Sequence, residues 1–132
     1  MAGETNLELL IREMQPHLNA VEYVFVTVKD YELIKREDTL FEFKETEGIT
    51  IVLDRLKADA LHLPYKFVAS WITLKIHSAL EAVGLTAAFS NALTTHNISC
   101  NVVAGFYHDH IFVDKKDAEK SVRVLQELSR SI

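Results

Sequence analysis

The sequence predicts an α+β fold in which helices pack on one face of antiparallel sheets. The chain has 132 residues, of which 48% are hydrophobic and 25% charged, and a chain of this size and composition can bury a core without metals or disulfides. Segments with helical periodicity alternate with segments of period two, in the order α-β-β-β-α-β-α-β-β-α. No linker rich in Gly, Pro or Ser interrupts this order, so we expect one domain or two small interlocked halves.

The first elements are a short helix and a strand. Thr5 and Glu8 have the spacing of a capping box, and apolar residues follow at helical spacing until Pro16. Strict alternation of β-favouring residues over 22–28 then predicts a strand that is covered on both faces. The polar segment 30–38 is expected to be a connection with at most one helical turn.

A hairpin and a second short helix complete the first half of the chain. Residues 40–45 and 49–53 read as paired strands with a turn at 47–48, where a glycine supplies the conformational freedom. Asp54 is placed to cap a helix that ends before Pro64, because the residue before a proline disfavours helical geometry.

The second half begins with a long β-rich run over 66–77, followed by a helix from Leu85 to about His96. Within these elements we expect Trp71 and Phe89 in the core. Two further strands, 99–104 and 107–113, come next. Asp114 then caps a final amphipathic helix.

Each half lacks one strand of a ferredoxin-like fold. The second half reads β-α-β-β-α, and the first reads α-β-β-β-α-β without an initial strand. We therefore predict two interlocked ferredoxin-like halves, 1–65 and 66–132, which share the strand around 66–77.

The net charge bears on the class of binding partner, and the cysteine content bears on the cellular compartment. The formal net charge is -5 with no block of either sign, which makes nucleic acid and anionic membrane poor partners. Cys100 is the only cysteine, so no intramolecular disulfide can form, and we expect it to be a small buried residue. The N-terminus lacks the pattern of a signal peptide, and no stretch approaches the roughly 18 apolar residues that span a bilayer. We therefore expect a cytoplasmic protein.

No strong catalytic signature is present. The sequence contains no phosphate loop, glycine-rich dinucleotide turn, paired-cysteine metal site or HExxH helix. Ser78, Ser90 and Cys100 have no identifiable base at a fixed spacing, so nucleophilic catalysis has little support.

One group of histidines could carry chemistry. His108 and His110 share a strand face, and the expected pairing brings Lys75 and His77 onto that same polar face. Three histidines could bind zinc with an open position. Lys75 would repel a metal cation, however, so an anion site, a polar interface or simple packing fits these residues better, and no metal is predicted.

The loop 78–85 between a strand and a helix is the second candidate. Gly84 lets backbone approach a ligand closely, and the helix N-terminus that follows suits a carboxylate. Glu81 could pair with an amino group of a ligand. The simpler interpretation is that Gly84 enables a tight turn and Glu81 is solvated.

Residues 71–113 resemble an ACT domain, a small ferredoxin-like regulatory module that binds amino acids. The strand WITLKIH, the turn 83–85 and the helix before Ile98 match the strand, V/P-G-x-L turn and helix of that module. The segment NISCNVVAGFYHDHIFV further resembles the GIS-strand-turn-D-x-I-x-V pattern of ACT repeats in aspartokinase regulatory regions and arginine sensors, with Asp109 on the acid. Asn97 replaces the usual glycine of that pattern.

The whole chain is similar to a family of small stand-alone bacterial proteins with tandem ACT-like halves. The similarity rests on MQPHL, FxxxEGITIVL, ADALxLPY, WITLxxHSALEAVGLTAAxS and NVVAGFYHDHIFV. It implies a ligand at an interface between ACT units. The residues that the resemblance places there are Val83, Gly84 and Leu85 at the ligand carboxylate, Ser99 and Cys100 on the facing strand, and Asp109 at an amino group.

The resemblance implies a non-enzymatic regulatory or sensor protein that binds an amino acid without a cofactor. It would act by forming homo-oligomers or by contacting a regulated protein partner, with ligand shifting the balance between states. Two alternatives remain open. One is a metal-binding protein or enzyme built on His77, His108 and His110, and the other is a ligand-free dimerisation module.

Overall fold

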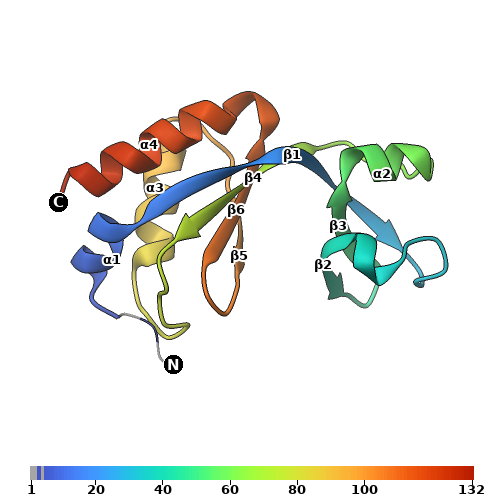
Figure 1. Cartoon of the computed structure of the whole chain (residues 1–132), viewed down its shortest axis with the longest axis horizontal. Helices are drawn as coiled ribbons and strands as arrows, with labels where there is room; N and C mark the ends of the chain where they lie inside the picture. Colours follow the sequence, from blue (N-terminus) through green and yellow to red (C-terminus); the bar gives the residue numbers. More distant parts are fainter. Residues whose placement is uncertain (1–2, 4) are drawn as a thin grey trace. The chain divides into compact units, whose positions relative to one another are not determined.

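The computed structural model describes residues 3 and 5–132, and the chain divides into two compact units. The first unit combines the N-terminal residues up to Ala20 with Ser70–Ile132, and the second is Val21–Ala69. Strands β1 (Gln15–Val28) and β4 (Val68–Lys75) each contribute residues to both units. The α+β class and the predicted order of helices and strands are confirmed (Figure 1).

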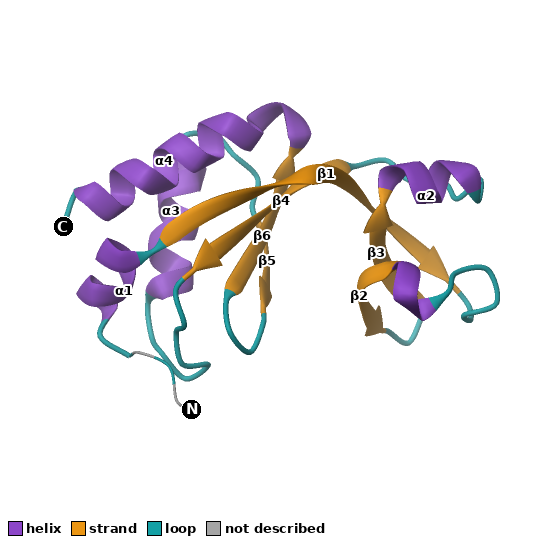
Figure 2. Ribbon diagram, viewed as in Figure 1, coloured by secondary structure: helices purple, strands orange, loops and turns teal. Residues whose placement is uncertain are grey.

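The first unit is a sheet in the strand order β1-β4-β6-β5 with helices on one face (Figure 2). Besides β1 and β4 its elements are α1 (Leu7–Glu13), α3 (Leu85–Thr95), β5 (Asn101–Ala104), β6 (Asp109–Asp114) and α4 (Ala118–Arg130). Because strand side chains alternate, one set of β4 and β6 residues faces the helices. The residues fully buried there include Leu10, Ile72, Leu74, Phe89, Leu93, Ile111, Val113 and Leu125.

The second unit holds the predicted hairpin. Strands β2 (Thr39–Lys44) and β3 (Ile49–Asp54) pair in antiparallel fashion, and β3 pairs with the end of β1, in the order β2-β3-β1. Helix α2 (Arg55–Ala60) covers one face. The buried residues of this small core are Val24, Val26, Ile34, Ile51, Leu53, Ala58 and Leu63.

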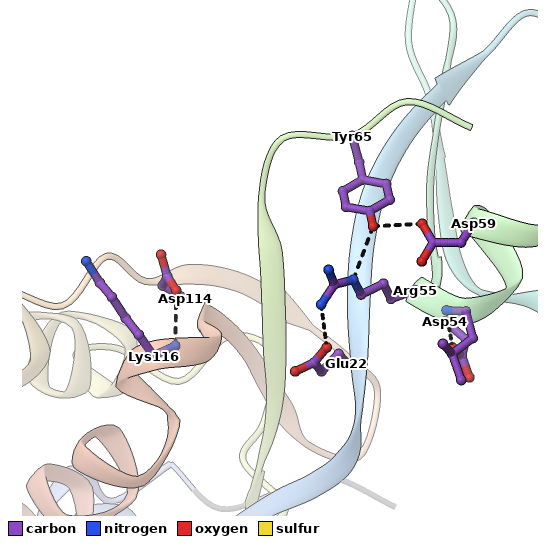
Figure 3. A network of polar contacts seen from close by, with 8 residues as sticks. Glu22, Asp54, Arg55, Asp59, Tyr65, Asp114 and Lys116 are labelled. Atoms are coloured by element: carbon purple, nitrogen blue, oxygen red, sulfur yellow. Dashed lines mark hydrogen bonds and ion pairs between the residues drawn. The ribbon is translucent and has the colours of Figure 1, made fainter. Parts of the chain in front are cut away.

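Side-chain hydrogen bonds hold α2 and the segment after it in place (Figure 3). The Arg55 guanidinium donates to Glu22 Oε1 at 2.9 Å and to the Tyr65 hydroxyl at 3.1 Å. That hydroxyl donates to Asp59 Oδ1 at 2.7 Å. Asp54 accepts from the Leu56 N–H at 2.8 Å, which confirms the predicted cap.

The structure corrects the predicted start of the chain in two respects. The cap of α1 is Asn6 and not Thr5, because Asn6 Oδ1 accepts from the Leu9 N–H at 3.0 Å. Strand β1 begins at Gln15 and includes Pro16, so it is 14 residues long and far exceeds the predicted 22–28. Residues 15–20 include Pro16 and no β-branched or aromatic side chain, so their composition did not indicate a strand.

Several other predicted bounds shift by a few residues. Strands β5 and β6 begin two residues later than predicted, at Asn101 and Asp109. Asp114 accepts from the Lys116 N–H at 3.1 Å, so it caps a single turn of 3-10 helix, Lys115–Asp117, and α4 follows directly from that turn (Figure 3).

Two helices end on a residue with left-handed backbone geometry, His62 after α2 (φ 55°) and Asn97 after α3 (φ 59°). In each case the N–H of the next residue donates to the carbonyl oxygen five residues back, Leu63 to Ala58 and Ile98 to Leu93. This geometry favours glycine, and asparagine tolerates it better than other residues. Asn97 can therefore occupy the position where the ACT pattern usually has glycine.

We predict that His62→Gly raises the free energy of unfolding by about 1 kcal/mol, because glycine removes the strain of a Cβ at positive φ. Asn97→Gly should give a smaller gain. The measurement is urea denaturation at fixed pH. His96→Gly is the control, since His96 has φ -97° and should lose stability on the same change. A loss of stability in His62→Gly would contradict this account.

Candidate functional site

The loop between β4 and α3 ends on a glycine whose backbone only glycine adopts without strain. Gly84 has φ +100° and is the N-cap of α3, and it has no side chain with which to cap the helix. The N–H groups of the first turn of α3 thus lack a side-chain acceptor at the N-cap position. Val83 before it is 83% exposed, whereas Leu85 after it is buried in the core.

A small cavity adjoins this helix start. Its volume is about 80 Å³, and it is lined by Ser78, Ala79, Leu80, Ala82, Leu85, Thr86, Ala104 and Asp109. Asp109 is the first residue of β6 and is half-buried. Burial raises the pKa of its carboxyl above the ordinary value, although a hydrogen bond with Ser78 and the nearby imidazoles of His108 and His110 act in the opposite direction. The cavity thus combines a half-buried carboxyl group with the positive end of a helix.

Ser99 and Cys100 line a different cavity. It has a volume of about 360 Å³ and lies between the end of α3 and the start of β5, lined by Ser90, Thr94, Asn97, Ile98, Ser99 and Cys100. Burial raises the pKa of the Cys100 thiol to about 11, against a hydrogen bond with Ser90 that lowers it. The thiol is therefore protonated near neutral pH, which fits a packing role and not a nucleophile.

The six residues that the resemblance places at a ligand thus fall into separate places within this unit. Leu85 and Asp109 line the smaller cavity, and Ser99 and Cys100 line the larger one. Gly84 sets the start of α3 beside the smaller cavity. A ligand in the smaller cavity would therefore contact only some of these six residues within one ACT unit.

His110 takes part in a polar network on the sheet face away from the helices. Its Nδ1 accepts from the Trp71 Nε1–H at 3.0 Å and lies 3.2 Å from the Thr73 hydroxyl. Asn19 donates to that hydroxyl at 3.2 Å. Because an indole nitrogen only donates, Nδ1 must be unprotonated, so the proton of the neutral ring is on Nε2. Trp71, expected in the core, instead lies half-buried on this face.

His77 lies two residues beyond the end of β4. His77 packs on the rings of Phe106 and Tyr107, with centroids 6.1 and 5.6 Å away. The rings of His108 and His110 are 6.5 Å apart. Among residues 3 and 5–132, no group of three or more His, Cys, Asp or Glu side chains is placed to hold a metal ion. The alternative of a three-histidine metal site has no support in the described structure.

Comparison with models of protein families shows to which family the chain belongs. A family model described as an ACT domain matches residues 2–70, which is more than half of the chain, and a second ACT domain model matches residues 66–127. The chain is a tandem ACT domain protein. The resemblance expected from the sequence is therefore confirmed at the level of the family.

Solved structures similar to this tandem ACT domain protein have diverse descriptions. A Vibrio cholerae protein of unknown function, described as a possible transport protein, is 46% identical over 93% of this chain and 95% of that chain, with a TM-score of 0.84. An Agrobacterium tumefaciens protein is 18% identical over 88% and 89% of the two chains, with a TM-score of 0.70. The ligand-free regulatory subunit of aspartate kinase from Thermus thermophilus is 6% identical over 86% and 95%, with a TM-score of 0.63.

The last two similarities show a shared fold alone. Comparison of the sequence with curated proteins gives no match. None of the helices formed by the described residues of this tandem ACT domain protein is both long and apolar enough to cross a membrane.

We predict that His110 makes folding stability fall as pH drops below about 6.5. Burial first, and then the neighbouring His108, lowers the pKa of His110 in the folded protein, against the attraction of Asp109. As pH falls through the unfolded value near 6.5, the unfolded chain therefore binds a proton that the folded chain does not. The free energy of unfolding should fall by at most about 1.4 kcal/mol per pH unit from this group.

The measurement is urea denaturation of wild type and His110→Asn at pH 5.5 to 7.5. Asparagine offers an acceptor near the position of Nδ1 but does not titrate. As pH falls, the free energy of unfolding of wild type should decrease relative to that of His110→Asn. Subtracting the two values cancels the contributions of the other histidines. A difference that stays constant across this range would refute the assignment.

Proposed function

We propose that this tandem ACT domain protein is a non-enzymatic regulatory or sensor protein that binds a small amino acid. The observation that carries the proposal is the 80 Å³ cavity in which the start of α3 and the Asp109 carboxyl come together. An α-amino acid carries both of the charges that these two features favour.

The carboxylate of the ligand would meet the first-turn N–H groups of α3, where the helix dipole favours negative charge. The ammonium group would meet Asp109. Burial raises the pKa of this carboxyl in the empty cavity, and a bound cation would favour its ionised form. Ligand and Asp109 would then form a charge-assisted hydrogen bond.

The size of the cavity limits the ligand. At roughly 15 Å³ for one water, a volume of 80 Å³ holds about five water-sized groups. Glycine, alanine and serine are of this order, and a long or aromatic side chain would have to extend past the exposed Leu80 or Val83 into solvent. We therefore expect small amino acids to bind best.

The mechanism would be a linkage between ligand binding and assembly. Ser99 and Cys100 line the other cavity, so their expected role at the ligand would require contribution from a second ACT unit. A ligand that binds the assembled state better shifts the population towards it. The similarity in fold to a regulatory subunit of aspartate kinase supports a role of this kind.

We predict that a small amino acid raises the melting temperature of the protein and that Asp109→Asn weakens its binding about ten- to a hundredfold, the worth of a hydrogen bond between charged groups. The first measurement is a thermal-shift screen of metal-stripped protein with the twenty amino acids and zinc. Calorimetric titration of any hit into wild type and Asp109→Asn follows.

Asp30→Asn is the matched control, since it makes the same change to an exposed carboxylate in the other unit. It should bind like wild type. A shift with zinc alone, lost in His108→Ala, would favour the metal alternative. A protein that forms a dimer yet responds to none of the amino acids would favour the ligand-free interaction module.

A further inference from the structure

The N-terminal segment touches the loop after β4 at two points, and each point is marked by a glycine. At the first point, a Cβ on Gly3 would lie 2.5 Å from the backbone N of Ala79 and 2.8 Å from the carbonyl oxygen of His77. Real Cβ atoms do not approach backbone atoms this closely. Gly3 therefore lies directly against the backbone of the loop, in a space that admits no side chain.

The second contact is at the other end of the loop. A Cβ on Gly84 would lie 2.9 Å from Cδ2 of Leu7, the first residue of α1. Leu7 itself is partly buried against the core of this unit. The N-terminal segment thus holds the loop at its beginning through Gly3 and at its end through Leu7.

The loop also has contacts with the rest of its unit, since Ser78 is hydrogen-bonded with Asp109 and His77 packs on the rings of Phe106 and Tyr107. Its hydrogen bonds from Ser78 N–H to Ile76 O and from Ala82 N–H to Ala79 O span two or three residues, and such bonds close tight turns without anchoring a loop to its surroundings. Leu80 and Val83 are 66% and 83% exposed, so these apolar side chains contribute little burial. Contact with the N-terminal segment therefore adds packing at the two ends of the loop.

We propose that Gly3 and residues 5–7 form an N-terminal strap that positions the loop 76–84. Ser78, Ala79 and Leu80 of this loop line the 80 Å³ cavity, and the same residues line a second cavity of about 180 Å³ that Gly3 also lines. Residues of the strap are thus positioning residues for the site. For its consequence on ligand affinity, the inference rests on the proposed function.

The experiment measures backbone hydrogen exchange of the ligand-free protein, because this readout does not depend on any ligand. Two variants test the strap: Gly3→Val, which forces it away from the loop, and a chain lacking residues 2–5, which removes the contact without adding bulk. In both, amides of residues 76–84 should exchange about tenfold faster, while the amides of α4 keep their protection.

Ala60→Val is the matched control, since it enlarges an exposed alanine on α2 in the second unit. Its loop should exchange like wild type. The contact between Leu7 and Gly84 is tested separately. Leu7→Ala should increase hydrogen exchange of the loop, because it removes the side-chain atoms that lie against Gly84. Leu7→Met should keep the exchange close to that of wild type, because methionine fills the same space. Unchanged loop exchange in Gly3→Val and in the shortened chain would overturn the proposal.

A second measurement separates the strap from the ligand. Glycine, L-alanine and L-serine are titrated into wild type, the shortened chain and Ala60→Val. The strap predicts weaker binding to the shortened chain by about the same factor as the gain in loop exchange. If loop exchange rises but none of the three binds wild type, the strap stands and the proposed amino-acid function is overturned. If the shortened chain binds as well as wild type, the strap has no role in the site.

Discussion

The alternation of side chains along β4 is the constraint on which the first unit depends. Ile72 and Leu74 point to the helices and are fully buried, while Trp71 and Thr73 point to the opposite face and meet His110. A shift of one residue in this strand would exchange the apolar core for the polar network, at a cost that no local rearrangement could offset. The register of β4 therefore also fixes where the strand ends and where the loop to α3 begins.

That loop is where we propose that a ligand binds. Its last residue, Gly84, adopts a backbone that other residues resist, and this turn directs the start of α3 towards the Asp109 carboxyl. The arrangement offers recognition of opposite charges a short distance apart. It offers no activated nucleophile, since burial keeps the Cys100 thiol protonated, and the described histidines do not gather into a metal site.

The family of this protein follows from the fold as a whole, whereas its ligand depends on a few side chains. ACT domain models match both halves of the chain, and structures with very low identity share the fold. The fold tolerates such divergence because it needs only suitable apolar residues at alternating and helical spacings. A ligand depends instead on a few side chains around a small cavity, and those can change without disturbing the core.

The sequence by itself determined the order of elements, the hairpin turn, the Asp54 cap and the ACT family, because each depends on local periodicity, turn chemistry or a short motif. It did not determine the length of β1, whose first residues include a proline and no β-branched or aromatic side chain. Nor did it determine the choice of Asn6 as a cap, since Thr5 and Asn6 are both residue types that occur at N-caps. Only the tertiary structure decided that Asp109 and Leu85 share a cavity from which Ser99 and Cys100 are absent, and that Trp71 bonds to His110. These contacts join residues far apart in the chain, and their geometry is set by how strands and helices pack.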